Sequence, residues 1–397
     1  MVEKVYLGKV ADDLYVLRVD DVHTVFFEAL WEIPERISYN AYLLVKGDHV
    51  VLFDGWKERY ADLFLETLKS VADPRDITEV IVHHLEPDHS GSIKKLAQVN
   101  SKAVFYGHPL AGKMLKSFYG VSRFKPLPDG ATIDIGTPAK FIHTPWLHWP
   151  ETSITYLQEY GVLLTCDAFG SYSLQPLFDD EVDLVELERE IRKYFVTVIG
   201  HYAPNVSKAI RKLEEAAITP RVIAPGHGTI LRSHIKDVLN FYSNLAEGKS
   251  VNKATIIYVS MYGNVEAVAS HVGEVLKARS IPVEVYAFTD SSRANVSDAL
   301  ASMTDSRLVV LGAATYEADV QPLIRFLVDI IGEKLSYRRD LRFLVLAPYA
   351  WSGIAGKKIV EKLKGFGFMS VEAVEWEGLA NNEVLERVSQ KLEQLII

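Results

Sequence analysis

The sequence predicts an α/β protein with two domains, an N-terminal αβ/βα sandwich followed by a C-terminal doubly wound parallel sheet. Three observations predict this architecture. The 397 residues exceed the usual size of one compact domain. Strands cluster early in the chain, whereas apolar strands and amphipathic helices alternate regularly after residue 254. Between these parts lies the polar segment AEGKSVNK, residues 246–253, so we expect domains over residues 1–248 and 253–397.

Apolar runs define the expected strands of the first domain. The early runs are LYVLRV, TVFFEALWEI, SYNAYLLV and HVVLFDGW. Four later runs alternate with helices, namely EVIVHH, KFIHTPW, VLLTCDA and RVIAPGHG. Clustered strands followed by alternating strands and helices favour two sheets packed face to face with helices outside them.

The second domain contains five expected strand and helix units. Its strands are ATIIYV, VEVYAF, RLVVLG, LRFLVLA and VEAVEW, and its last helix is NEVLERVSQKLEQLII. Continuous runs of Val, Ile and Leu are typical of a parallel sheet that helices cover on both faces. This number of units predicts a domain of flavodoxin size.

Composition limits the functions that the chain can have. Apolar residues make up 48% of the sequence, enough for large cores, and the net charge of −9 disfavours nucleic acid as a partner. No run approaches the roughly 18 apolar residues of a membrane span, and the start MVEKVYLGKV lacks the apolar core of a secretory signal. The single cysteine, Cys166, favours a reducing compartment, so we expect a soluble cytoplasmic protein.

The stretch VHHLEPDHSG, residues 82–91, is the first candidate site. It follows an apolar strand and precedes a helix, which places it at a strand end, where sheets present reactive groups. Three later strands also end near a candidate ligand, His148, Asp167 or His227. Without a Cys-x-x-Cys pair, any metal must be held by His, Asp and Glu. The expected ligand set is His84, Glu86, Asp88, His89, His148, Asp167 and His227.

Four histidines and three carboxylates are enough for two metal ions with Asp167 as the bridge.

The remaining candidate residues lie outside this ligand set. His201 and Tyr202 follow an apolar run and are expected to orient a ligand or deliver a proton from outside the ligand set. Cys166 is interpreted as a packed strand residue. Histidines outside the spacing are interpreted as structural: His23, His49, His83, His108, His143, His234 and His271.

Three loops of the second domain predict a second site. Each follows a parallel strand, at the edge where a doubly wound sheet binds its ligand. The loop SMYGNV opens a helix, where free N–H groups favour phosphate, and the other two loops offer the aromatic rings of Tyr316 and Trp351. The expected cofactor-binding residues are Ser260, Met261, Tyr262, Gly263, Asn264, Val265, Ala314, Thr315, Tyr316, Glu317, Ala350, Trp351, Ser352 and Gly353.

These motifs together resemble flavodiiron proteins over essentially the whole chain. HxExDH, TPWxHWP, a strand ending in CD, and PGHG are similar to the motifs of their metallo-β-lactamase-like domain, and the three later loops are similar to those of flavodoxin. The resemblance implies one iron held by His84, Glu86 and His148, with Asp167 bridging to a second. It implies Asp88, His89 and His227 for the second iron, and water displaces the histidine at the His89 position in some members. Val265 departs from the usual threonine, which predicts weaker FMN binding.

The resemblance also implies a function. Electrons from FMN would reach the two irons, which would reduce dioxygen to water, nitric oxide to nitrous oxide, or both. An apolar shell from Trp146, Trp149 and Phe26 or Phe27 would shield the irons. A separate donor, a rubredoxin or a reduced deazaflavin, would supply the electrons. A head-to-tail homodimer would bring the FMN of one subunit to the irons of the other, and the sequence leaves open whether dimers pair into tetramers.

Two alternatives remain at this point. Zinc hydrolases of the same fold have HxHxDH, with imidazole where this chain has Glu86, so a harder oxygen donor and the second domain favour iron over zinc. The other alternative is a flavin electron carrier whose first domain is only a scaffold. An intact set of seven ligands argues against that reading.

Overall fold

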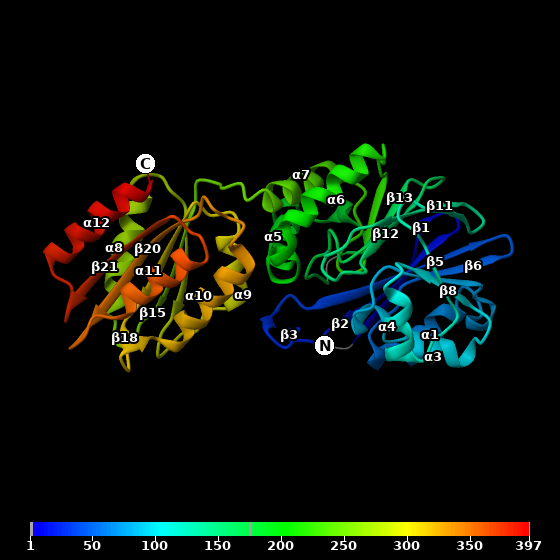
Figure 1. Cartoon of the computed structure of the whole chain (residues 1–397), viewed down its shortest axis with the longest axis horizontal. Helices are drawn as coiled ribbons and strands as arrows, with labels where there is room; N and C mark the ends of the chain where they lie inside the picture. Colours follow the sequence, from blue (N-terminus) through cyan, green and yellow to red (C-terminus); the bar gives the residue numbers. More distant parts are fainter. Residues whose placement is uncertain (1–2, 175, 397) are drawn as a thin grey trace. The chain divides into compact units, whose positions relative to one another are not determined.

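The computed structural model describes residues 3–174 and 176–396. The chain forms two compact units, and each is described by itself (Figure 1). The first comprises Met1–Phe195 and Pro204–Ser243, and the second Val196–Ala203 and Asn244–Ile397. Residues 196–203 and 244–248, which we expected in the first domain, therefore group with the second unit.

Two sheets form the centre of the first unit. The larger has the order β1-β2-β5-β6-β7-β8-β9, antiparallel from β1 to β6 and parallel from β6 to β9. The smaller has the order β10-β11-β12-β13-β14, in which only β13 and β14 are parallel. The strands of the larger sheet are β1 Lys4–Ala11, β2 Leu14–Asp21, β5 Ile37–Lys46, β6 His49–Phe53, β7 Glu79–Val82, β8 Val104–Gly107 and β9 Phe124–Pro126. Those of the smaller are β10 Thr132–Asp134, β11 Pro138–His143, β12 Ser153–Leu157, β13 Val162–Cys166 and β14 Val222–Pro225.

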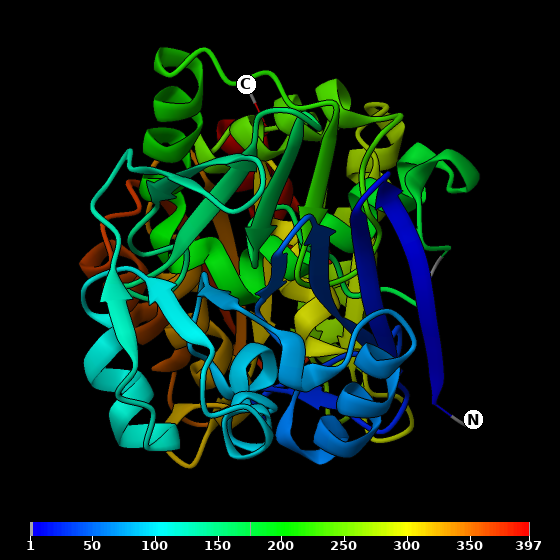
Figure 2. The ribbon, with the colours of Figure 1, turned by 90° about the vertical axis from the view of Figure 1, so that its right-hand side faces the viewer.

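The apolar core of the first unit lies between these sheets. Tyr42 and Phe53 of the larger sheet are buried with Phe141 and Leu164 of the smaller. Helices cover the outer faces: α1 Ala61–Lys69, α3 Ile93–Val99 and α4 Ala111–Tyr119 lie on one side, and α6 Ala203–Glu215 and α7 Ile235–Ala246 on the other (Figures 1 and 2). A short hairpin, β3 Phe26–Phe27 and β4 Trp31–Glu32, precedes β5. The expected αβ/βα sandwich is confirmed.

The second unit is a five-stranded parallel sheet with the order β16-β15-β17-β20-β21. This is the strand order of flavodoxin-like folds. The strands are β15 Ala254–Val259, β16 Val283–Phe288, β17 Leu308–Ala313, β20 Arg342–Tyr349 and β21 Ser370–Glu377. Buried residues of α8 Asn264–Ala278 and α12 Asn382–Ile396 pack on one face of the sheet. The remaining helices are α9 Val296–Met303, α10 Pro322–Leu335 and α11 Ala355–Gly365 (Figure 1).

Candidate metal centre and cofactor pocket

The seven predicted ligand side chains come together in the first unit, although they lie on four separate loops. Four of them lie on the loop after β7, and the other three follow β11, β13 and β14. The two sheets thus contribute jointly to one site. Six of the seven side chains are buried, and Glu86 is half-buried.

A single helical turn arranges three of the four ligands after β7, namely Glu86, Asp88 and His89. Pro87 begins this turn, α2 Pro87–Ser90, at a position where its missing N–H removes no helical hydrogen bond. The carbonyl oxygen of Glu86 accepts hydrogen bonds from the backbone N–H groups of His89 (3.0 Å) and Ser90 (3.1 Å). The Ser90 hydroxyl lies 2.8 Å from the same carbonyl oxygen. These contacts fix the backbone between Glu86 and His89.

Asp167 lies between two pairs of histidines. Its Oδ1 is 2.9 Å from Nε2 of His89 and 3.3 Å from Nε2 of His227. Its Oδ2 is 3.5 Å from Nε2 of His84 and 3.6 Å from Nε2 of His148. Each carboxylate oxygen therefore faces a different histidine pair, as a carboxylate that bridges two metal ions does.

One carboxylate completes each histidine pair. Oε2 of Glu86 lies 2.8 Å from Nε2 of His148 and 3.4 Å from Nε2 of His84. Two ligands at about 2.1 Å from one metal ion, at right angles, are about 3 Å apart, so these spacings fit a common ion. On the other side, Oδ2 of Asp88 lies 3.5 Å from Nε2 of His227. Oδ1 of Asp88 lies 3.8 Å from Nε2 of His89.

Several of these buried atoms make no hydrogen bond within the described residues. They include both carboxylate oxygens of Asp88 and Oδ2 of Asp167. A buried carboxylate without a partner is costly, and a bound cation removes that cost. Mixed imidazole and carboxylate donors suit non-haem iron better than a thiolate-preferring metal. The residues present therefore fit two iron ions.

The electrostatics of the site also favour cations. Burial opposes ionisation of Asp167, but the neighbouring His89 and a hydrogen bond with His227 hold the pKa of Asp167 well below its usual range. Burial also opposes ionisation of Glu86, yet hydrogen bonds with His148 and His84 lower its pKa. Burial raises the pKa of Asp88. His89 is buried, but Asp88 and Asp167 raise its pKa to about 9, so metal binding there displaces a proton.

Residues outside the ligand set hold the ligands in place, and the sequence did not single them out. Nδ1 of His84 lies 2.8 Å from Oε1 of Glu151, so Nε2 of His84 is left for a metal ion. Nδ1 of His227 likewise lies 2.9 Å from the carbonyl oxygen of Ser38. Glu151 stands three residues after His148 in the HWPE stretch, which was an available signal. No spacing in the sequence points to Ser38.

Tyr194 makes a contact with a ligand of the kind that we expected from His201 or Tyr202. It lies at the end of α5 (Leu184–Tyr194), and its hydroxyl donates a hydrogen bond of 2.7 Å to Oδ1 of Asp167. Nδ1 of His201 instead lies 3.0 Å from the carbonyl oxygen of Glu333, within the second unit. The rings of His201 and Tyr202 pack together, with 4.7 Å between their centroids.

His83 and Cys166 have structural surroundings. Nδ1 of His83 lies 2.6 Å from Oδ2 of Asp54, and its Nε2 lies 2.8 Å from the hydroxyl of Thr155. The His83 ring is also stacked on Phe53, at 6.0 Å between centroids. Cys166 is buried, and burial raises the pKa of its thiol well above the usual value. The contacts of His83 hold the strands together, whereas Sγ of Cys166 lies within 4.8 Å of ligand atoms of His89 and Asp167.

Of the four aromatic residues considered for the shell, Phe27 and Trp149 lie against ligand rings, whereas Phe26 and Trp146 are exposed. Phe27 is buried and its ring lies 6.0 Å from that of His227, and the Trp149 ring lies 4.8 Å from that of His84. Phe26 and Trp146 are instead 53% and 44% exposed. A carboxylate oxygen of the exposed Glu28 lies within 4.8 Å of ligand atoms of Glu86 and His148, so this face of the centre carries a third acidic group.

A cavity of about 580 Å³ in the second unit brings together most of the expected cofactor-binding residues. Tyr262 and Trp351 at its rim are 92% and 82% exposed, which leaves both rings available to a flat ligand. The expected residues in its lining are Ser260, Met261, Tyr262, Asn264, Val265, Ala314, Thr315, Tyr316, Glu317, Ala350 and Trp351. The lining also contains Pro348, Tyr349, Gly378 and Leu379, which we did not expect, and it does not include Gly263, Ser352 or Gly353.

Side-chain contacts hold the loops of this cavity in place. The Ser260 hydroxyl accepts hydrogen bonds from the backbone N–H groups of Gly263 (3.1 Å) and Glu266 (3.4 Å), so it organises the turn that opens α8. Gly263 has a φ of 82°, a conformation that favours glycine. The Thr315 hydroxyl accepts from the N–H of Ala355 (3.2 Å) and thus links the second loop to the third. The Asn264 amide donates to the carbonyl oxygen of Gly378 (2.7 Å). This bond links the first loop to the segment with Gly378 and Leu379, which lines the cavity although we did not expect it.

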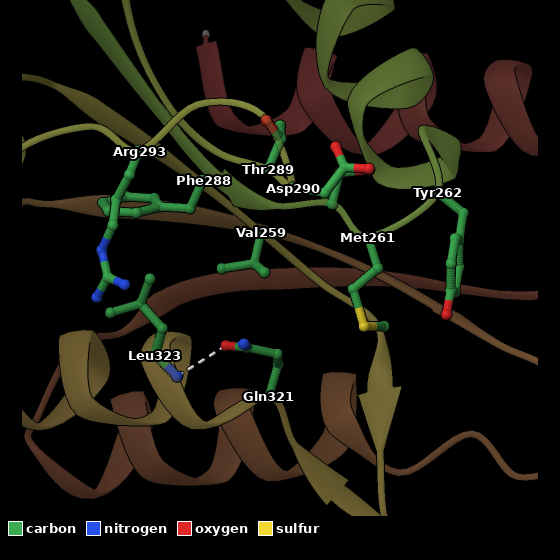
Figure 3. A pocket seen from close by; sticks show the side chains of 10 residues that line it. Val259, Met261, Tyr262, Phe288, Thr289, Asp290, Arg293, Gln321 and Leu323 are labelled. Atoms are coloured by element: carbon green, nitrogen blue, oxygen red, sulfur yellow. Dashed lines mark hydrogen bonds between the residues drawn. The ribbon is translucent and has the colours of Figure 1, made fainter.

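A second cavity, of about 400 Å³, adjoins the same turn on the side of β16 and α10. Figure 3 shows it between the ring of Phe288 and the side chains of Gln321 and Leu323, with Met261 and Tyr262 at one end. Oε1 of Gln321 accepts from the N–H of Leu323 (2.7 Å) and caps α10. Ser260, Met261 and Tyr262 line both cavities, so the turn before α8 separates them.

Comparisons with known proteins find similar proteins for both parts of the chain. The family described as "ODP family beta lactamase" matches residues 37–228, and the flavodoxin family matches residues 256–390. A variant of the flavo di-iron protein from Thermotoga maritima has 36% sequence identity, with complete coverage of both chains (100%) and a TM-score of 0.91. The rubredoxin oxygen:oxidoreductase from Desulfovibrio gigas has 25% identity over 98% of both chains and a TM-score of 0.91. The nitric oxide reductase of Moorella thermoacetica is 28% identical over 361 residues, which cover 89% of each chain.

Proposed function

This chain belongs to the flavodiiron protein family, and from that premise we propose that it reduces a small diatomic molecule, dioxygen or nitric oxide. It is an oxidoreductase whose cofactors are a di-iron centre and FMN. Dioxygen would be reduced to water and nitric oxide to nitrous oxide. One observation carries the proposal: the two oxygens of Asp167 face two separate groups of imidazole and carboxylate ligands, 3.5 Å from His84 on one side and 2.9 Å from His89 on the other.

We propose that each group of residues has one role at the metal centre. His84, Glu86 and His148 would hold one iron, Asp88, His89 and His227 the other, and Asp167 would bridge them. The iron pair, when bound, supplies coordination positions and electrons to the diatomic substrate. The chain's own residues fix the ligands and limit access of water: Glu151 orients His84, Tyr194 donates to Asp167, and Phe27 and Trp149 cover two histidines.

FMN would occupy the cavity of about 580 Å³ in the second unit. We propose that its phosphate meets the turn organised by Ser260, because that turn leads into the N-terminus of α8, which begins at Asn264 and has no side-chain cap. The exposed rings of Tyr316 and Trp351 would pack against the isoalloxazine. Val265 is buried and has no hydroxyl for the phosphate, so this chain would bind FMN more weakly than a relative with threonine there.

The assembly and the electron donor are also proposals. We propose a head-to-tail homodimer that brings FMN of one subunit to the irons of its partner, and a rubredoxin or a reduced deazaflavin as the donor. One similar protein is named a rubredoxin-oxygen oxidoreductase, which supports a rubredoxin-type donor. A cytoplasmic location is proposed from the composition. Among the described residues, no helix is both long and apolar enough to cross a membrane.

A zinc hydrolase is the alternative that the site opposes most clearly. Glu86 places a carboxylate oxygen 2.8 Å from Nε2 of His148, where hydrolases with HxHxDH have an imidazole. A hydrolase would not need the flavodoxin part of the chain.

The proposed function is tested by supplying reduced rubredoxin to the anaerobic protein and recording dioxygen and nitric oxide consumption with electrodes. Consumption of at least one gas supports the proposal, and consumption of neither by protein that contains iron and FMN contradicts it.

A further inference from the structure

Strand β5 of the larger sheet makes a dense set of hydrogen bonds to the loop that carries His227 on the smaller sheet. The backbone N–H of Asn40 donates to the carbonyl oxygen of Gly226 (2.8 Å). Tyr42 donates from its hydroxyl to the carbonyl oxygen of Pro225 (2.7 Å). The Ser38 hydroxyl accepts from the N–H of Gly228 (2.9 Å), and its carbonyl oxygen lies 2.9 Å from Nδ1 of His227. The loop is therefore held from both ends.

The side chain of Asn40 lies at the centre of this set. Its amide nitrogen, Nδ2, donates to the carbonyl oxygens of Pro225 (3.0 Å) and Gly228 (3.0 Å), the residues on either side of the Gly226–His227 pair. Asn40 is 1% exposed, so water does not compete for these bonds. One planar group thus fixes the separation of two carbonyl groups that flank a ligand.

We propose that Asn40 is a positioning residue for His227, and that it controls how firmly the second iron is held. This inference rests on the proposed di-iron function. The second iron would be held by Asp88, His89 and His227. His227 follows β14 of the smaller sheet, whereas Asp88 and His89 follow β7 of the larger sheet. The second iron can be held only if the two sheets keep their relative placement at this edge, and Asn40 joins them there.

The geometry explains why a small displacement matters. Nε2 of His227 lies 3.5 Å from Asp88 and 3.3 Å from Asp167, and ligands must stay within about 0.5 Å of the productive position to hold a metal well. The first group of ligands, with His84 and Glu86, makes no described contact with Asn40. Loss of Asn40 should therefore release the second iron before the first.

A purely structural role for Asn40 makes a different prediction, and the chain offers a matched control. Asn100 is also buried (3% exposed), and its Nδ2 donates to the carbonyl oxygens of Pro74 (2.9 Å) and Ile77 (2.8 Å). Its side-chain oxygen also accepts from the N–H groups of Lys102 and Ala103. None of these residues belongs to the ligand set. Asn100→Ala should therefore cost at least as much stability as Asn40→Ala, without affecting a ligand.

The experiment compares wild type, Asn40→Ala and Asn100→Ala as full-length protein loaded with iron and FMN. Each is dialysed against a graded series of chelator concentrations, and iron per chain, FMN per chain, the electron paramagnetic resonance signal of isolated iron and the thermal midpoint are measured. We expect Asn40→Ala to lose one iron at roughly 10- to 100-fold lower chelator concentration than wild type, with a signal from the single iron that remains. FMN content should stay unchanged, and Asn100→Ala should retain both irons.

Equal iron retention in the two variants would overturn the proposal, whether both keep the metal or both lose it, because Asn40 would then act only through stability. If Asn40→Ala does not fold, Tyr42→Phe takes its place. This variant removes one hydroxyl bond to Pro225, and we expect the same selective loss on a smaller scale; retention equal to wild type would overturn the proposal. Wild type with fewer than two irons would contradict the di-iron function itself, so the two failures are distinguishable.

Discussion

The hydroxyl of Tyr194 donates a hydrogen bond of 2.7 Å to Oδ1 of Asp167, the carboxylate that lies between the two groups of proposed iron ligands. The same oxygen faces His89 and His227. Burial, and then the charge of Asp167, raises the pKa of Tyr194 well above its usual value, so the hydroxyl stays a donor at any working pH. The proposed bridging carboxylate is therefore tied to the end of α5, so Tyr194 should help to set its orientation and electron density.

Tyr194→Phe should leave the iron content nearly unchanged and reduce turnover roughly 10-fold, because outer hydrogen bonds of this kind typically change activity or affinity by about 10- to 100-fold. The visible spectrum of the iron centre should also shift. Tyr242→Phe is the control, since that buried hydroxyl makes no hydrogen bond to the ligand set. Steady-state gas consumption and absorption spectra are the measurements. Identical kinetics for the two variants would mean that Tyr194 is only a packing residue.

Asp167→Ala should abolish dioxygen and nitric oxide consumption and lower the iron content below two per chain. Removal of the carboxylate takes one ligand from each iron and leaves His89 and His227 without the oxygen that faces them. FMN should stay bound, because its cavity is lined entirely by residues of the second unit. Iron analysis and flavin absorbance of one preparation measure both effects. Full turnover in this variant would refute the bridging role.

Gly226→Ala should loosen His89. A Cβ atom at this position would lie 2.6 Å from Cε1 and 3.0 Å from Nδ1 of His89, so the ring or the loop must move. Overpacking of this kind costs about 1–3 kcal/mol, and here part of that strain would fall on a ligand. We expect iron to leave the variant at roughly 10-fold lower chelator concentration.

The control for this change is Gly273→Ala on α8, where an added Cβ would meet only Ile256, at 3.8 Å. Chelator titration of both variants checks the prediction. A Gly226→Ala protein that keeps iron as well as the Gly273→Ala protein would show that His89 contributes little to holding the metal.

Trp351→Ala should raise the Kd for FMN about 10-fold, which corresponds to roughly 1.4 kcal/mol of lost stacking. The Trp351 ring is 82% exposed at the rim of the cavity, so its removal should not unfold the unit. Met369→Ala is the matched control, because this exposed side chain of the same unit does not line the cavity. Quenching of FMN fluorescence during titration of the apoprotein gives both constants. Equal Kd values would exclude stacking on Trp351.

The sequence predicted the fold and the grouping of the seven ligand side chains because both follow from local patterns. Continuous apolar strands between amphipathic helices specify the parallel sheet of the second unit. His84, Glu86, Asp88 and His89 share one short loop, and the remaining ligands stand close after apolar strands. The carboxyl ends of strands from both sheets meet at one edge of the sandwich, so a ligand placed after each strand was enough to predict the grouping.

The partners of the ligands depend on packing that spacing does not encode. Tyr194 reaches Asp167 from a helix that begins 17 residues later in the chain (184 − 167), and Ser38 meets His227 through a backbone carbonyl group that has no sequence signal. The surroundings of His201 have a related explanation. The apolar run before them is a π-helical turn, Phe195–Ile199, that continues α5, and it leads to a segment grouped with the second unit.

The central claim is that one chain holds a di-iron centre and FMN, and the most direct test is metal and flavin analysis of the anaerobically purified protein. Iron and zinc are counted by elemental analysis, and FMN by the visible spectrum after release. We expect about two irons and one FMN per chain, because the protein has two ligand groups around Asp167 and a cavity for the flavin. Zinc without flavin would contradict this claim and would favour a hydrolase.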